Sequence, residues 1–153
     1  MKKQIIYLLI GFISFATFAQ TDAKRVSNFN LEKKVAIQGY DPVSYFKQNK
    51  AVKGDKQFAV NFEGITYYFS TVTNKEIFLK NPASFEPQFG GWCAYAMGAN
   101  AEKVEINPES FKIVDSKLYL FYNAYFNNTL KSWNKDEQNL KTKAIINWKK
   151  INN

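Results

Sequence analysis

The chain has 153 residues and a formal net charge of +8, with no histidine and a single cysteine. This length suits one domain with a sizeable core, and the 17% aromatic content argues against intrinsic disorder. The absence of histidine excludes Ser-His-Asp triads, Cys-His dyads and His-ligated zinc or haem, and the single thiol excludes an internal disulfide. Most standard enzyme sites are therefore ruled out, and the balance favours a protein without catalytic activity.

The first nineteen residues have the pattern of a secretory signal peptide. Lys2 and Lys3 precede an apolar run over residues 5–18, which ends in small residues that place a cleavage before Gln20. The run is shorter than the roughly 20 residues that span a bilayer, so cleavage is favoured over a retained anchor. We therefore predict an exported protein, periplasmic or secreted, with no integral membrane segment once residues 1–19 are removed.

The positive charge is carried almost entirely by lysine, because Arg25 is the only arginine. Base readout and bidentate clamping of phosphate both favour arginine. We therefore expect a solvated lysine surface, with some attraction to anionic membrane or cell-wall surfaces, and no nucleic-acid partner.

The mature chain divides into a polar segment and one domain. Residues 20–34 show no clear periodicity and are interpreted as a flexible N-terminal segment, and residues 35–153 form the domain. Alternating apolar residues over 58–62 and 65–69 predict a β-hairpin that turns at Gly64.

The second half of the domain predicts further elements in turn. A short helix is expected over residues 74–80, and a second hairpin joins 111–114 to 118–122 through Asp115-Ser116. Residues 132–151 predict a lysine-rich amphipathic helix whose apolar residues are Trp133, Leu140, Ala144, Ile145 and Trp148. Docking of this helix on its own sheet is favoured over membrane binding. The expected class is a small α+β domain with two antiparallel β-hairpins, short helices and a C-terminal amphipathic helix.

A local pattern of Asn or Asp, then Pro, any residue, Ser and an aromatic residue begins at Asp41, Asn81 and Asn107. The first residue can accept backbone N–H groups at a helix N-terminus or turn, and proline suits the first helical position. Asp41 is therefore interpreted as a capping residue in preference to a catalytic acid.

The only thiol lies in the segment from Phe89 to Gly98, where two glycines, good helix formers and a closing glycine predict a tight turn and a short helix. Cys93 would lie in the first turn, where the helix dipole favours a thiolate. Met97 follows at i+4 on the same face, and two soft sulfur donors suit Cu(I). The alternative is that both side chains simply fill the core.

These residues resemble the YHS domain family, especially its exported single-domain members. The resemblance covers roughly residues 35–125 and rests on Gly39-Tyr40-Asp41-Pro42-Val43, on the first hairpin and on Gly90-Gly91-Trp92-Cys93-Ala94, with the second hairpin closing it.

The resemblance implies a link to copper, because YHS domains occur in copper-transporting ATPases and two of their cysteines are suspected of binding metal. The corresponding positions here are Ser70 and Asn74, and the family's histidine position falls near Phe62. The metal inference therefore does not carry over to that segment. Some similar exported proteins carry selenocysteine, which implies redox work at a position such as Cys93.

Three functions follow as hypotheses. The first is an exported binding module that engages a small ligand, or a soft metal such as Cu(I) through Cys93 and Met97. The second is a thiol-dependent redox protein with Cys93 as the catalytic nucleophile, and the third is a non-catalytic envelope interaction protein. The expected ligand pocket is lined by Tyr40, Asp41, Trp92 and Tyr95.

Overall fold

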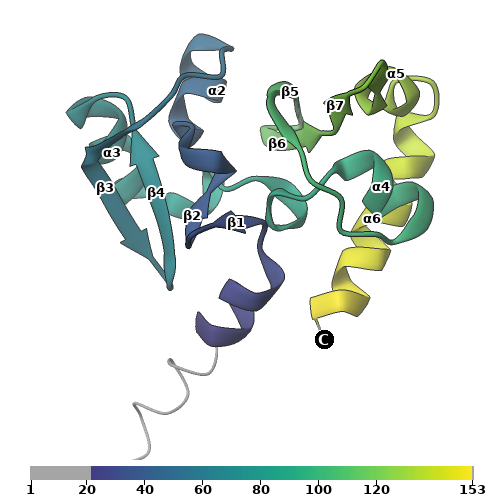
Figure 1. The fold of residues 1–153 in the computed structure, drawn as a ribbon, viewed down its shortest axis with the longest axis horizontal. Helices are drawn as coiled ribbons and strands as arrows, with labels where there is room; N and C mark the ends of the chain where they lie inside the picture. The colour runs from purple at the N-terminus through teal and green to yellow at the C-terminus, as the bar shows by residue number, and fades with distance from the viewer. Residues whose placement is uncertain (1–21, 153) are drawn as a thin grey trace, which may run out of the picture.

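The computed structural model describes residues 22–152, which form an α+β fold (Figure 1). The predicted class is confirmed, with both expected hairpins, short helices and a C-terminal helix. The predicted signal peptide, residues 1–19, lies outside the described residues. Between residues 22 and 152, no helix combines the length and apolar character needed to cross a bilayer.

The first half of the domain is built on a four-stranded sheet. Its strands are β1 (Leu31–Glu32), β2 (Val35–Ala36), β3 (Asp55–Phe62) and β4 (Ile65–Phe69), in the spatial order β1-β2-β4-β3. The predicted hairpin is β3–β4, which pairs Phe62 with Ile65 across its turn.

The strand β4 alternates strictly between the two faces of this sheet. Ile65, Tyr67 and Phe69 are fully buried, whereas Thr66 and Tyr68 face the other side. Helices α2 (Pro42–Gln48) and α3 (Val72–Lys80) contact this strand, and Phe78 of α3 places its ring 4.9 Å from that of Tyr67. The buried face of β4 therefore anchors the core of this half.

The second half begins after two short 3₁₀ segments, η2 (Pro82–Ser84) and η3 (Gln88–Gly91), which follow η1 (Ile37–Gly39) of the first half. Strands β5 (Asn107–Val114) and β6 (Lys117–Phe121) form the predicted second hairpin. A small third hairpin, β7 (Asn123–Ala124) with β8 (Asn127–Asn128), was not predicted.

Three helices complete this half: α4 (Ala94–Asn100), α5 (Thr129–Trp133) and α6 (Glu137–Asn152). They gather beside β5–β6 on one side of the molecule, opposite the β3–β4 hairpin (Figure 1). Their buried side chains join those of η3 and β6 in a second core cluster that includes Phe89, Met97, Tyr119, Phe121 and Trp133.

The single C-terminal helix predicted over residues 132–151 is in fact two helices, α5 and α6. Leu140 and Ala144 are buried as expected, but Ile145 is 49% exposed, so its assignment to the packed face was wrong. The helix α6 docks chiefly on α4 rather than on a sheet. Gly98, predicted to end the short helix, lies inside α4, where a Cβ would come within 2.5 Å of the Leu140 carbonyl oxygen. Close packing of two helices explains this glycine.

The N-terminal segment predicted to be flexible is folded where the structure describes it. Residues 22–28 are helical, and β1 follows. The Arg25 guanidinium forms ion pairs with Glu86 and Glu63 and lies 4.5 Å from the centre of the Phe29 ring. This segment has few apolar residues, so the periodicity of apolar residues could not show that it is held by one half-buried arginine.

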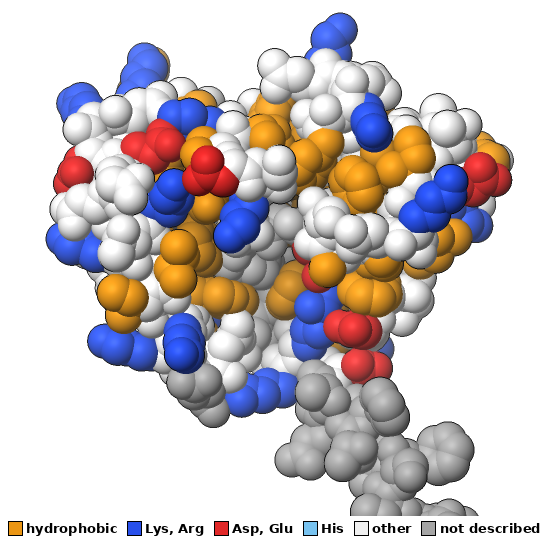
Figure 2. All heavy atoms as spheres, turned by 180° about the vertical axis from the view of Figure 1, so that it is seen from behind, with side chains coloured by type: hydrophobic (Ala, Val, Ile, Leu, Met, Phe, Trp, Pro, Cys, Tyr) orange, Lys and Arg blue, Asp and Glu red, His pale blue; other side chains and the backbone are white. Residues whose placement is uncertain are grey.

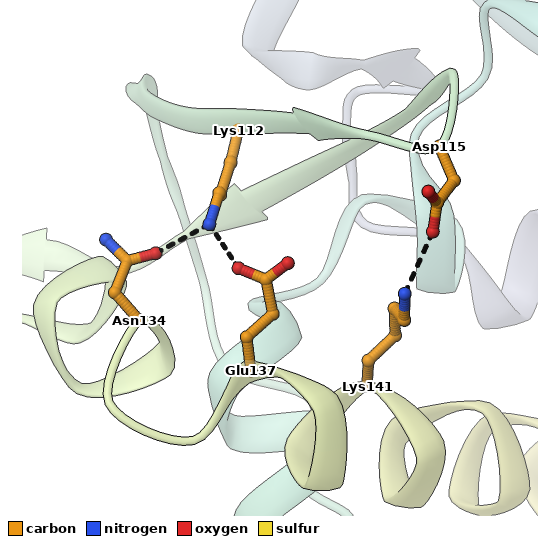
Figure 3. A network of polar contacts seen from close by, with 5 residues as sticks. All are labelled: Lys112, Asp115, Asn134, Glu137 and Lys141. Atoms are coloured by element: carbon orange, nitrogen blue, oxygen red, sulfur yellow. Dashed lines mark hydrogen bonds and ion pairs between the residues drawn. The ribbon is translucent and has the colours of Figure 1, made fainter.

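Polar contacts join the second hairpin to the C-terminal helices (Figure 3). Lys112 of β5 bonds Glu137 and the Asn134 side chain, and Lys141 of α6 lies 2.9 Å from the Asp115 carboxylate in the hairpin turn. The hydrogen bond from Lys141 lowers the pKa of Asp115, and the same bond raises the pKa of Lys141.

Candidate functional site

Cys93 lies at the N-terminal boundary of α4, one position before the predicted first turn, and its side chain is fully buried. Its sulfur accepts the Tyr122 backbone N–H at 3.4 Å and lies 3.3 Å from the Thr129 hydroxyl oxygen. That hydroxyl donates its one proton to the Tyr122 carbonyl at 2.9 Å, so the thiol must donate to Thr129. Both polar roles of a neutral thiol are therefore satisfied within the protein.

This geometry does not fit a soft-metal or redox site. Met97 is also fully buried, but it belongs to the core cluster around Trp133, whereas Cys93 belongs to the cluster around the four-stranded sheet. No group of three or more His, Cys, Asp or Glu side chains within residues 22–152 could hold a metal ion. A nucleophile must be reached by its substrate, and the sulfur of Cys93 is enclosed.

Asp41 is the most heavily bonded side chain of the domain. One carboxylate oxygen accepts the backbone N–H groups of Val43 and Ser44 at the start of α2, which confirms the predicted cap. The other accepts the Ser70 N–H at 2.8 Å, the Ser70 hydroxyl at 2.6 Å and the Asn74 amide at 2.7 Å. This fully buried carboxylate is structural.

The two partners of Asp41 occupy informative positions. Ser70 and Asn74 are the residues that the YHS resemblance aligns with the suspected metal-binding cysteines. Here their hydroxyl and amide groups point at a carboxylate instead. The local geometry therefore holds α2 and α3 together where that resemblance would expect a metal.

The four residues of the expected ligand pocket do not converge. Asp41 is enclosed, and the Trp92 indole N–H donates to the Asn28 carbonyl at 2.7 Å. Tyr95 packs, partly buried, against both core clusters. Tyr40 lies next to a pocket, because the ammonium of Lys53, which lines that pocket, is 4.6 Å from the centre of the Tyr40 ring.

The paired glycines before Cys93 have a packing role. A Cβ at Gly90 would lie 2.9 Å from the Trp148 ring and 3.2 Å from the Phe29 Cα, and Gly90 accepts the Asn30 backbone N–H at 2.8 Å. Gly90 also has a φ of 61°, a left-handed conformation that suits glycine. The motif that looked like a chemical site is thus the joint between the N-terminal segment and α6.

A pocket of about 540 Å³ lies beside the outward face of β4, and we call it the lysine pocket. Its volume is within the usual range for small-molecule sites. Three ammonium groups and one carboxylate line it. Its residues are Glu32, Lys33, Val35, Gln38, Gly39, Lys53, Gly54, Lys56 and Tyr68.

Two glycines shape this pocket around Tyr68. A Cβ at Gly54 would lie 2.6 Å from the Tyr68 backbone, and one at Gly39 would lie 3.2 Å from the Tyr68 ring. The Gly54 N–H also donates to the Gly39 carbonyl at 2.9 Å, which closes the two loops on each other. Because neither glycine has a side chain, Tyr68 can lie close to both loops, and the space beside its ring stays open.

The lysine side chains differ in how they are held. Lys53 donates to the Gln38 carbonyl at 2.7 Å and lies over Tyr40, so its ammonium is positioned in advance. Lys33 and Lys56 are exposed, with no side-chain partner among the described residues. The pocket therefore presents excess positive charge beside an aromatic ring.

Sequence reasoning missed this pocket because its lysines are scattered over the turn after β1, the loop before β3 and β3 itself. The one local signal was a glycine beside a lysine or tyrosine in each loop, at Lys53-Gly54 and Gly39-Tyr40. Parallel pairing of Val35 with Thr66 brings these loops together, and that pairing is not visible in the sequence.

No known family model, curated protein or solved structure matches this chain. The likeness to YHS domains accordingly stays a prediction carried by the residues quoted for it.

Proposed function

We propose that this chain is a non-catalytic binding module that holds an anionic small molecule in the lysine pocket. The observation that carries the proposal is the charge of the lining, in which Lys33, Lys53 and Lys56 face a single carboxylate, Glu32. The signal-peptide pattern of residues 1–19 supports an exported location for this module.

The pocket offers an anion two kinds of contact. Lys53 supplies a fixed ammonium, and the flexible side chains of Lys33 and Lys56 can close on a carboxylate or phosphate group. The Tyr68 ring offers a flat apolar surface for the rest of the ligand. A carboxylate or phosphate joined to a planar group fits both features.

The buried and hydrogen-bonded position of the Cys93 sulfur supports a binding role over a catalytic one. Its thiol is used to hold Tyr122 and Thr129, so neither the redox hypothesis nor the copper hypothesis gains support from the geometry. Binding through the lysine pocket requires neither a nucleophile nor a metal.

The test is calorimetric titration of the full chain with inorganic phosphate, citrate and phenyl phosphate. We expect phenyl phosphate to bind best, because it alone combines the charge with an aromatic ring. K33Q/K56Q should weaken binding by about a hundredfold, since each of the two lost charge-assisted bonds is worth roughly a factor of ten.

The matched control is K149Q/K150Q, which removes the same charge from the end of α6, where neither lysine lines the pocket. It should leave the dissociation constant unchanged. Equal weakening by both variants would reduce the effect to net charge, and absence of binding by all three anions would reject the proposal.

A further inference from the structure

The β7–β8 hairpin ends in an unusual turn. Its two central residues are Tyr125 and Phe126, both with positive φ, 49° and 64°. Tyr125 is 90% exposed and Phe126 is fully exposed. Turns with positive φ at both centres favour Asn-Gly, and aromatic side chains there are disfavoured by the backbone and by water together.

No other part of residues 22–152 exposes large apolar side chains to this degree. The other exposed large apolar side chains are each only about half exposed: Val72, Leu79, Ile145 and Ile146. The two rings at the tip therefore lie on the surface without packing on the domain.

The tip is rigidly held at its base. The Thr129 N–H donates to the Tyr122 carbonyl, and Asn128 caps α5 by accepting the Leu130 N–H. Beneath this base lies Cys93, whose sulfur contacts both Tyr122 and Thr129. The enclosed thiol thus braces the hairpin that presents the aromatic rings.

The chain segment that carries the tip is basic. From Ser116 to Lys135 the chain contains no acidic residue but has three lysines, Lys117, Lys131 and Lys135. Lys131 and Lys135 have no side-chain partner among the described residues, and α5, which carries Lys131, follows the hairpin directly. The segment that carries the tip therefore suits an anionic surface.

We infer that Tyr125 and Phe126 insert into the interface of an anionic lipid bilayer, with Lys131 and Lys135 facing the headgroups. Aromatic rings are favoured at the boundary between headgroups and acyl chains. Two rings on a convex tip are too few for the apolar centre of a stable protein interface, but they suffice for shallow insertion.

The experiment places a polarity-sensitive fluorophore at the tip of the full chain, through Asn127→Cys. Cys93 is buried, so labelling of the folded protein is confined to position 127. The apolar run over residues 5–18 can bind the chain to a vesicle by itself. The readout is therefore the emission of the label and not cosedimentation. We expect a blue shift with phosphatidylglycerol vesicles and a much smaller one with phosphatidylcholine.

Two variants and a second label test the assignment. Y125N/F126G keeps a favoured turn and should abolish the shift, and K131Q/K135Q should raise the vesicle concentration needed by about tenfold. K149Q/K150Q is the charge-matched control, and a label at Lys150→Cys should stay in water. An unshifted tip label in the wild-type background, or an undiminished shift in Y125N/F126G, would overturn the inference.

Discussion

Asp41 shows how a single carboxylate can organise a small domain. Five donors converge on its two oxygens: two backbone N–H groups of α2, the backbone N–H and hydroxyl of Ser70, and the side-chain amide of Asn74. Each charge-assisted bond in a dry site is stronger than its neutral counterpart, and each donor would be left unsatisfied without it.

Asp41→Asn should therefore destabilise the domain by about 3 kcal/mol, because the amide nitrogen would face donors in place of an acceptor. Asp55→Asn is the matched control, since Asp55 is exposed and accepts the Gln57 N–H at a solvated site. Its effect should stay within about 0.5 kcal/mol. Urea unfolding measures both, and a similar loss in the two variants would refute a special role for Asp41.

Cys93 should be unreactive in the folded protein. Because its sulfur is enclosed and bonded, we expect the rate of reaction with a disulfide reagent to follow the rate at which the domain opens. Mild denaturant should accelerate the reaction in step with the fall in unfolding free energy. Rapid labelling under native conditions, at a rate near that of the unfolded chain, would show that the thiol is accessible and reopen the metal and redox hypotheses.

At the scale of elements, the two long hairpins were predictable and the third was not. Strict alternation and a glycine at 64 were enough for β3–β4, and a polar Asp115-Ser116 turn was enough for β5–β6. The β7–β8 turn carries Tyr-Phe, which local rules would never place at two left-handed positions. The break between α5 and α6 was also missed, because apolar spacing alone does not report where a helix stops.

The Y125N/F126G variant should be more stable than the wild type by about 1 kcal/mol. Asn and Gly tolerate positive φ with little strain, and neither exposes a ring to water. Thermal unfolding by circular dichroism measures this change. A lower melting temperature would show that the rings stabilise the hairpin by packing, contrary to their exposure.

At the scale of the whole molecule, buried tyrosines link the halves and the N-terminal segment. Tyr45 donates to the Pro108 carbonyl at 2.9 Å, which ties α2 to β5. Tyr67 donates to the Glu86 carboxylate, which also binds Arg25 of the N-terminal helical segment. Burial raises the pKa of both phenols, and the charge of Glu86 raises that of Tyr67 further.

These tyrosines predict a specific alkaline instability. Their folded pKa values lie above the value of about 10 for a free phenol, so the stability they contribute is complete below that pH. It is lost as pH rises above 10, because only the unfolded chain can then release the two protons. Absorbance at 295 nm should show the Tyr45 and Tyr67 phenols ionising together with unfolding. Early, independent ionisation of all tyrosines would contradict this.

The candidate site was the least predictable part of the molecule. Its residues come from four strands, the 3₁₀ segment η1 and two loops, and no motif links Lys33, Lys56 and Tyr68 along the chain. The opposite held for Cys93 and Asp41, which had clear local patterns and proved to be internal supports. Local sequence patterns therefore indicated buried packing residues, whereas the lysine pocket is formed by strand pairing between distant segments.

The joint at Gly90 has a consequence for how the chain is made. The Asn28 side chain donates to that of Asn152 at 2.8 Å across 124 residues of sequence, and Trp148 and Phe29 meet at the same glycine. A ribosome therefore releases the first part of this joint long before its last part exists. Until α6 emerges, the N-terminal helical segment has only part of its docking surface. Contacts at this joint must therefore form after the last helix has been made, however early the sheet and helices of the first half assemble.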